Sequence, residues 1–339
     1  PNQSVLLHRQ PDNVWRIDFQ LGWDADPEEE KKEENIRPRV QAMLGEDVEF
    51  ELEWASVYTF RCRKMDDYIH QRVFFMGDAA HQVSPFCARG ANGALQSTEN
   101  LAWKLARVLK GEAHEALLAT YNDERQHGAA ENILNSTRAT DFITPKSRVS
   151  RLFRDSVLEL AERYPFARRL VNSGRLSMPC HYDDSPLNGH ETEGLPLELR
   201  PGSPAKDAPI GLAGRRAWLL NQLGERFTLL LDGRVDSARA ETLRAELEPL
   251  LARQDDLDLL VVGPAPHALT ELPRSRQIED VENLVGERYG LTAGVAYLIR
   301  PDQHVSARWH EIKAADVEAA LDRALGRHLN AEEARHATA

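Results

Sequence analysis

The sequence has few cysteines, and their positions exclude two kinds of site. Only Cys62, Cys87 and Cys180 occur among its 339 residues. They are too far apart to form a CxxC redox pair or a zinc-ligand spacing. We therefore expect no bound metal ion. Scattered, unpaired cysteines also fit a reducing compartment, so a cytoplasmic location is expected.

Positive charge and long apolar runs are also scarce. A net charge of −12 argues against a nucleic acid or an anionic membrane surface as the partner. No stretch approaches the roughly eighteen consecutive apolar residues that a membrane span needs, and no signal peptide is visible. The length of 339 residues is enough for two domains with cores of their own.

The glycine fingerprint of dinucleotide-binding proteins is also missing. That fingerprint is a G-x-G-x-x-G motif after a strand, followed about twenty residues later by an acidic residue. Its glycines let the backbone approach a pyrophosphate closely. No such stretch occurs anywhere in the chain.

Residues 73–109 are the most informative part of the sequence. The apolar run at 73–76 predicts a short buried strand. Gly77 and Asp78 end that run and place a carboxylate at the carboxyl end of the strand, where ligands often bind in α/β proteins.

A glycine-containing loop and a helix are predicted to follow. Pro85, Gly90 and Gly93 mark a loop whose backbone can approach a ligand closely, since glycine has no Cβ. From Ala94 onward apolar residues recur at helical spacing, and Gly111 is a natural end for that helix. The free N–H groups at the start of such a helix favour an anionic or electron-rich ligand.

The segment GDAAHQVSPFCARGANGALQSTENLAWKLA, residues 77–106, resembles a motif of a known family. It is similar to the second flavin-contacting motif of the FAD-dependent aromatic hydroxylases, the class A flavoprotein monooxygenases related to p-hydroxybenzoate hydroxylase. The similarity is greatest to the phenol and 3-(3-hydroxyphenyl)propionate hydroxylase branch. The family pattern comprises GDAAH, a proline, a G-x-N-G-like turn and an N-L-A-W-K-L helix, and the sequence carries these parts in order.

The resemblance implies a set of FAD-binding residues. Asp78 would bind the ribityl chain, and the loop from Pro85 to Gly93 would lie beside the isoalloxazine ring. Backbone N–H groups near Ala91 and Asn92 would face the pyrimidine edge of that ring. The implied cofactor-binding residues are Gly77, Asp78, Pro85, Gly90, Ala91, Asn92 and Gly93. No catalytic base is assigned, and His81 is expected to make a structural hydrogen bond.

The resemblance also implies an activity, that of an oxidoreductase of aromatic catabolism. The whole enzyme would reduce FAD with NADH or NADPH and react it with O2. A flavin C4a-hydroperoxide would then hydroxylate a small phenolic substrate. Two alternatives stay open: a flavin oxidoreductase of similar fold that does not hydroxylate, and a flavin-free fragment that acts as a binding or dimerisation module.

The missing fingerprint bears on how much of such an enzyme is present. The family carries G-x-G-x-x-G near its N-terminus and an Asp-Gly motif later, and neither is found here. The chain starts at Pro1, without a methionine. We therefore expect the C-terminal part of a longer protein, with weak or no FAD binding on its own because the pyrophosphate and adenosine contacts are lacking.

The overall fold class expected is α/β. Residues 1–172 would be the C-terminal portion of a FAD- and substrate-binding domain of the p-hydroxybenzoate-hydroxylase-like fold. Alternating residues predict strands at 13–20 and 51–63, with a hairpin partner at 5–7, and helical spacing predicts helices at 36–44, 132–142 and 151–170. The stretch 117–125 matches the family's LL-x-x-Y-x-x-E-R segment and is expected to hold helices together.

Two further regions and a tail complete the predicted organisation. Residues 173–209 form a proline-rich connector, residues 210–330 a second α/β domain, and residues 331–339 a tail. Strands are predicted at 227–231, 257–262, 291–299 and 304–309, and helices at 238–251 and 314–325.

The second α/β domain also carries a resemblance. Its RPD-x-x-V-x-x-R-W stretch, residues 300–309, resembles the thioredoxin-like C-terminal domain of the same hydroxylase branch. No redox cysteine pair is present, so the expected role is packing and subunit contact, with a homodimer formed through this domain. His304 and His310 are expected to be exposed at strand ends.

Overall fold

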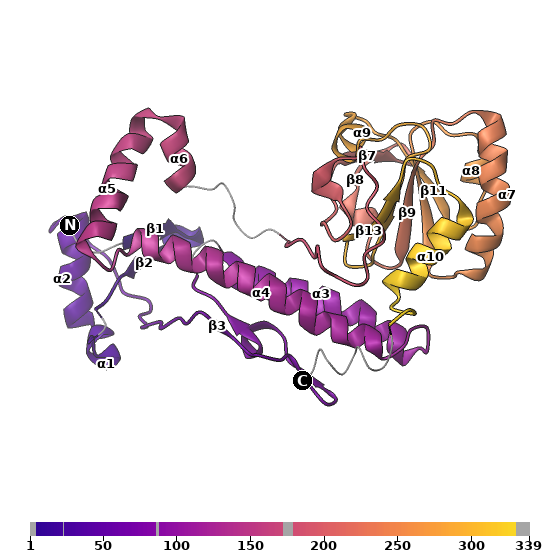
Figure 1. The fold of residues 1–339 in the computed structure, drawn as a ribbon. Helices are drawn as coiled ribbons and strands as arrows, with labels where there is room; N and C mark the ends of the chain where they lie inside the picture. Colours follow the sequence, from indigo (N-terminus) through magenta and orange to yellow (C-terminus); the bar gives the residue numbers. More distant parts are fainter. Residues whose placement is uncertain (1–4, 23, 86–87, 172–178, 330–339) are drawn as a thin grey trace. The chain divides into compact units, whose positions relative to one another are not determined.

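The computed structural model describes residues 5–22, 24–85, 88–171 and 179–329 (Figure 1). Contacts between residues divide the chain into two compact units, which are described separately. The first unit, unit 1, comprises Pro1–Cys62, Val83–Cys87 and Asn135–Arg175, and the second, unit 2, comprises Arg63–Gln82, Ala88–Leu134 and Leu176–Ala339. The predicted boundaries at 172, 209 and 330 stay a prediction. The predicted tail, residues 173–178 of the predicted connector, and Cys87 lie outside the described residues.

Unit 1 begins with the predicted hairpin. β1 (Val5–Arg9) pairs antiparallel with β2 (Trp15–Phe19), which places Leu7 opposite Ile17. The turn between them uses Asp12 in a left-handed conformation, which aspartate tolerates better than most residues. The hairpin is confirmed, although β1 is exposed along its whole length rather than half-buried.

The charged stretch after the hairpin forms α1 (Pro27–Glu30) and α2 (Glu33–Leu44), and α2 confirms the helix predicted at 36–44. The strand predicted at 51–63 is wrong for 51–62, which have no regular secondary structure. Alternating apolar and polar residues favour a strand. The backbone N–H and C=O groups of a strand, however, also need a neighbouring strand for their hydrogen bonds. Only Arg63–Lys64 (β3) has such a neighbour, His81–Gln82 (β6), and both strands belong to unit 2.

The last part of unit 1 contains two helices where one was predicted at 151–170. α5 (Arg148–Arg163) ends at Tyr164, whose backbone is extended, and α6 (Pro165–Val171) begins at the next residue. Proline disfavours a helical conformation in the residue before it, which explains the break.

Unit 2 contains the helix pair that carries the flavin-like motif. α3 (Arg89–Leu109) and α4 (Ala116–Ile143), of which residues 116–134 belong to this unit, lie side by side and antiparallel (Figure 1). α3 ends before Gly111, which adopts a φ of +74°, as predicted for a helix stop. None of the helices in the described part of the chain has the length and apolar character needed to cross a membrane.

The strand predicted before α3 is shorter and more exposed than expected. Only Val73–Phe74 (β5) pairs, with Ile69–His70 (β4), and Val73 is 55% exposed. The apolar run serves a different purpose, because residues 74–76 pack against a small cluster that includes Tyr68 and Tyr121. A short helical turn of the 3-10 type, η2 (Gly77–Ala79), follows the run.

The rest of unit 2 contains a five-stranded sheet in the order β11-β10-β9-β12-β13. The three strands on one side are parallel, and β12 and β13 form an antiparallel hairpin beside β9. The strands are β9 (Phe227–Asp232), β10 (Leu257–Val262), β11 (Ser275–Ile278), β12 (Ala296–Ile299) and β13 (Val305–Trp309).

Helices connect and follow these strands, which confirms the predicted α/β order. They are α7 (Ser237–Arg253), α8 (His267–Thr270), α9 (Leu284–Tyr289) and α10 (Ala314–Ala324). Two features were not predicted from the sequence: β11, and the hairpin of β7 (Pro209–Leu212) and β8 (Arg215–Trp218). The predicted start of β12, residue 291, is five residues too early.

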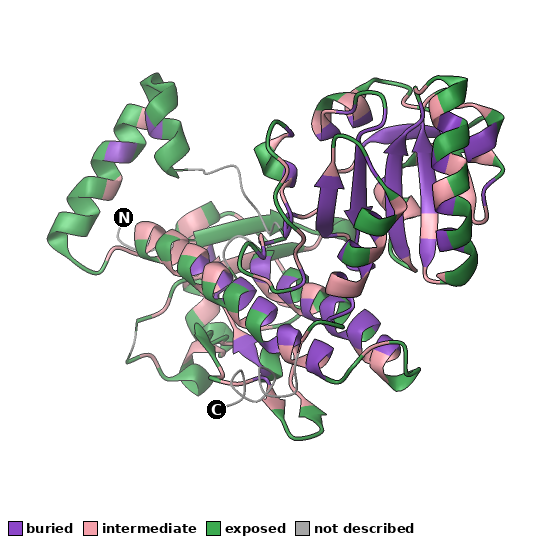
Figure 2. Cartoon of the chain, turned by 45° about the vertical axis from the view of Figure 1, so that its right-hand side comes forward, coloured by how far each residue is buried: buried purple, intermediate pink, exposed green. Residues whose placement is uncertain are grey.

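The central sheet is buried on both faces (Figure 2). Leu229 of β9 belongs to a core cluster with α7 and α10, and the next residue, Leu230, belongs to a second cluster on the opposite face. Trp103 of α3 and Leu117 of α4 are members of the first cluster. The helix pair and the sheet therefore share one hydrophobic core.

Truncation of Leu229, which is fully buried, tests this shared core. Leu229→Ala should lower the free energy of unfolding by about 2–5 kcal/mol, because it leaves a cavity in the core. Leu197→Ala, at a position 71% exposed, is the control and should change it by less than about 0.5 kcal/mol. Urea denaturation measures both values, and equal values would contradict the assignment of this core.

Candidate functional site

Gly77 and Asp78 form a tight turn packed against α3. Gly77 is buried with a φ of +57°, and a Cβ at this position would lie 3.3 Å from the Cβ of Ala94 in α3. Glycine suits the site twice over, because it allows both the left-handed backbone and the close approach. The side chain of Asp78 is exposed on this turn.

The predicted loop at Gly90–Gly93 is instead the beginning of α3, which starts at Arg89 and not at Ala94. Glycine normally costs a helix about 1 kcal/mol relative to alanine. Here packing favours it: a Cβ on Gly93 would lie 3.2 Å from the Nδ2 of Asn132 in α4. The prediction of a loop was wrong because helix–helix contact overrides local propensity.

The N-cap residue of α3 makes no side-chain hydrogen bond to the helix. This residue is Ala88, in a left-handed conformation, and the methyl side chain of Ala88 offers no acceptor to cap the helix. The first N–H groups of a helix have no acceptor within the helix. Ala91 and Asn92 are exposed in this first turn, and Gly90 is half-buried.

Gly77 lies against Ala94 in the second turn of α3, and Gly77, Asp78 and the first turn of α3 all belong to unit 2. Pro85, the remaining predicted residue, is exposed and belongs to unit 1. Its place beside a flavin stays a prediction.

Arg125 of α4 supports the first turn of α3 from inside the protein. The fully buried guanidinium donates from Nε to the Oγ of Ser97 (3.1 Å) and from Nη2 to the carbonyl oxygen of Gly93 (3.2 Å). Its Nη1 donates to the hydroxyl of Tyr182 (2.7 Å). The sequence predicts that Arg125 holds helices together, but no sequence pattern indicates its contact with the carbonyl of Gly93.

His81 contacts the same group of residues. Its Nε2 lies 3.2 Å from the Oγ of Ser97, which itself donates to the carbonyl of Gly93. Burial, and secondarily the positive charge of Arg125, lower the pKa of His81 to about 4. A buried, neutral imidazole with a serine partner agrees with the structural hydrogen bond expected for His81.

A second polar cluster of the helix pair surrounds Glu124. This carboxylate accepts hydrogen bonds from Arg300 (2.7 and 2.9 Å), Lys104 (2.7 Å) and Asn100 (2.6 Å). Ser185 donates a further one (2.6 Å). Burial opposes the ionisation of Glu124, but the adjacent cations Arg300 and Lys104 prevail and hold its pKa well below the usual value.

The RPD turn between β12 and β13 completes this cluster. Arg300 also donates to Asp302 (2.9 Å), and the Nδ1 of His304 lies 2.9 Å from the carbonyl oxygen of Asp302. His304 is buried and its ring stacks on Tyr182 at 4.4 Å, so the prediction of an exposed His304 was wrong. The turn folds inward because its charges are paired there. His310, by contrast, is exposed as predicted.

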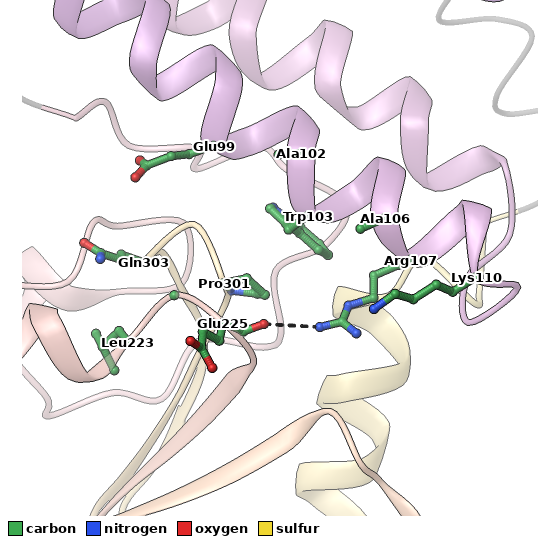
Figure 3. A pocket seen from close by; sticks show the side chains of 11 residues that line it. Glu99, Ala102, Trp103, Ala106, Arg107, Lys110, Leu223, Glu225, Pro301 and Gln303 are labelled. Atoms are coloured by element: carbon green, nitrogen blue, oxygen red, sulfur yellow. Dashed lines mark hydrogen bonds between the residues drawn. The ribbon is translucent and has the colours of Figure 1, made fainter.

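A cavity of about 430 Å³ lies beside the second half of α3 (Figure 3). Trp103 and Arg107 of α3 line it together with Pro301 and Glu225, and Arg107 donates to the backbone carbonyl of Glu225 (3.4 Å). It borders the RPD turn rather than the glycine turn. Among the described residues, no group of three or more histidine, cysteine, aspartate or glutamate side chains could hold a metal ion.

The burial of His81 gives a pH-dependent prediction. Its folded pKa of about 4 lies below the ordinary 6.5, so the unfolded chain binds more protons between these values. The free energy of unfolding should therefore fall as the pH drops from about 6.5 to 4, and His81→Gln should lose less stability over that range. His310→Gln, at an exposed position, is the control and should behave as the wild type. NMR titration of the His81 ring with a midpoint near 6.5 would contradict the prediction.

The chain has recognisable relatives among known protein families. Residues 5–136 match the FAD binding domain family. The chain is 26% identical over 338 residues to a 3-(3-hydroxy-phenyl)propionate/3-hydroxycinnamic acid hydroxylase of Burkholderia cenocepacia, covering 95% of this chain and 58% of that protein. It is 33% identical over 295 residues to a 4-methyl-5-nitrocatechol 5-monooxygenase of Burkholderia sp., covering 84% of this chain and 49% of that protein.

Solved structures share the fold. The flavin-dependent monooxygenase PieE, in complex with FAD and substrate, superposes with a TM-score of 0.71 at 21% identity, covering 96% of this chain and 59% of that one. Aklavinone-11 hydroxylase, in a ternary complex with FAD and aklavinone, gives a TM-score of 0.65 at 22% identity, covering 96% and 58%. The chain is therefore similar in sequence and in fold to FAD-dependent monooxygenases, and it spans between about half and three fifths of the length of these relatives.

Proposed function

We propose that this chain is part of a FAD-dependent monooxygenase that hydroxylates a small phenolic substrate. The observation that carries the proposal is the exposed Asp78 carboxylate on a glycine turn that packs against the uncapped start of α3. The family match over residues 5–136, which includes both features, supports it.

The residues at this site suit the flavin half of FAD. A carboxylate at Asp78 accepts hydrogen bonds from the hydroxyls of a ribityl chain. The N–H groups around Ala91 and the dipole of the 21-residue helix α3 stabilise negative charge near its first turn. Gly77 keeps the turn close to α3, so the carboxylate and the helix start face one ligand from the same unit.

When bound, FAD supplies the redox chemistry and the activation of oxygen. The residues of this chain then bind the cofactor, orient it and exclude water from it. We infer that NADH or NADPH is the reductant and O2 the co-substrate. The phenolic substrate class rests on relatives whose names specify hydroxyphenylpropionate, dichlorophenol and nitrocatechol. A cytoplasmic location belongs to the same proposal.

We further propose that residues 210–330 form a thioredoxin-like domain without redox activity, which contributes to a homodimer. The connection of β9 through α7 to the parallel strand β10, followed by an antiparallel hairpin and α10, supports this assignment. The sequence of this region contains no cysteine, so it has no thiol–disulfide chemistry.

Flavin titration of the chain tests the role of Asp78. Asp78→Ala should weaken binding of both riboflavin and FAD about tenfold or more, the loss expected for a hydrogen bond to a charged acceptor. The two flavins should bind with similar, weak affinity, since the contacts predicted here involve only their shared half. Fluorescence quenching measures both affinities.

Asp184→Ala, at an exposed aspartate in the segment before the sheet, is the matched control and should leave both affinities unchanged. Equal weakening by the two variants, or riboflavin binding that Asp78→Ala leaves unchanged, would contradict the proposed site.

Product analysis with a longer protein that contains this chain separates hydroxylation from simple flavin oxidation. With FAD, NAD(P)H and a phenol, a mono-oxygenated product formed in step with NAD(P)H consumption supports the proposed reaction. Hydrogen peroxide without an oxygenated product would instead indicate an oxidoreductase that does not hydroxylate.

A further inference from the structure

We propose that the Arg300-Pro301-Asp302 turn is a positioning element for the flavin-binding helix. In this view the α/β region that follows residue 210 sets the register of α3 against α4, and thereby the geometry of the first turn of α3. The connection to a flavin rests on the proposed function. The register itself is a property of the chain alone.

Arg300 lies where three segments of unit 2 meet. Its guanidinium carbon lies 5.4 Å from the ring centre of Trp103 in α3 and 5.8 Å from that of Tyr182. The same group donates two hydrogen bonds to the Glu124 carboxylate of α4, at 2.7 and 2.9 Å. A planar guanidinium that lies beside two aromatic rings and donates two hydrogen bonds to one carboxylate leaves little freedom for the groups around it.

The α3 side of the contact completes the pairing of charges. Lys104 donates to Glu124 (2.7 Å), and Asn100 donates both to Glu124 (2.6 Å) and to Asp302 (3.1 Å). The four charged side chains, two cations and two anions, are at most 2% exposed. A shift of α3 along α4 would leave one of these buried charges without its partner, so the cluster selects one register.

The first turn of α3 follows this register through Arg125. Arg125 is the next residue after Glu124 in α4, and it holds the Gly93 carbonyl and the Ser97 hydroxyl. Glu124 and Arg125, two adjacent and oppositely charged residues of α4, therefore connect the RPD turn to the Gly93 carbonyl near the start of α3. The two sets of hydrogen bonds are joined by the backbone of α4 and by Tyr182, whose hydroxyl accepts from Arg125 and whose ring centre lies 5.8 Å from the guanidinium carbon of Arg300.

Hydrogen–deuterium exchange on the full 339-residue chain tests the proposal without any flavin. Arg300→Met removes the pairing while keeping an apolar side chain between Trp103 and Tyr182. It should raise the exchange rates of the amides of residues 93–104 by about tenfold or more, because α3 loses its fixed register. The amides before residue 93 are left out, since they have few intrahelical acceptors and little protection.

Arg308→Met is the matched control. Arg308 is also a buried arginine of the β12–β13 hairpin, but it donates to the Glu191 carboxylate (3.0 Å) and the Pro196 carbonyl (2.6 Å), away from the helix pair. It should leave exchange in residues 93–104 unchanged. Equal acceleration by the two variants, or acceleration spread evenly over α3 and the sheet, would show general destabilisation and overturn the proposal.

A double-mutant cycle with Glu124 tests the Arg300–Glu124 pair specifically. It also distinguishes loss of this pair from a general folding defect of Arg300→Met. In the Glu124→Gln background, Arg300→Met should raise exchange in α3 by a smaller factor than in the wild type, because the partner charge is already absent. Arg300→Lys keeps the positive charge but loses the planar guanidinium that donates two parallel hydrogen bonds. Its exchange rates in α3 should lie between those of the wild type and those of Arg300→Met. Independent, multiplicative effects of the two substitutions, or a lysine variant indistinguishable from the wild type, would overturn the assignment. Failure of the flavin titration alone would leave this result intact.

Discussion

The pairing of the buried Glu124 carboxylate is the interaction on which unit 2 depends. An ionised carboxylate in the protein interior costs several kcal/mol unless cations and hydrogen-bond donors surround it. Glu124 obtains these from Lys104 and Asn100 of α3 and from Arg300 of the RPD turn. No single segment can satisfy it, so the helix pair and the RPD turn must assemble together. Removal of one partner is expected to cost about 3–5 kcal/mol.

A charge cluster of this kind adds more to specificity than to stability. Well-packed apolar side chains of similar volume would often stabilise a core as much. The apolar contacts between the helix pair and the sheet, such as Trp103 against Phe227, tolerate small displacements. The hydrogen bonds of Arg300 do not tolerate them, because hydrogen bonds weaken steeply as their geometry departs from the ideal. The hydrophobic core thus supplies most of the burial, and the charges determine which arrangement forms.

Local sequence patterns predicted the elements whose stability comes from their own periodicity. Continuous apolar runs predicted β9 and β10, and helical spacing predicted α7 and α10. β11 was not predicted, because its sequence, SRQI, has little apolar character. This strand forms because β10 lies beside it and pairs with it. The prediction for residues 51–62 was wrong for the opposite reason. Their apolar and polar residues alternate, but they have no partner strand in the described part of the chain. The burial of His304 could not be predicted from local sequence either, because the ring that it stacks on, Tyr182, is distant in sequence.

The candidate site shows the same limit in its glycines. From sequence, Gly90 and Gly93 predict a loop because glycine disfavours a helix. In the structure they begin one, and the absent side chain of Gly93 makes room for Asn132 while its carbonyl receives Arg125. The helix therefore starts earlier than its propensity allows, with an alanine at the cap and its first N–H groups open. That early, uncapped start places donors beside the Asp78 turn. The contacts that make local prediction fail are thus the contacts that build the proposed flavin site.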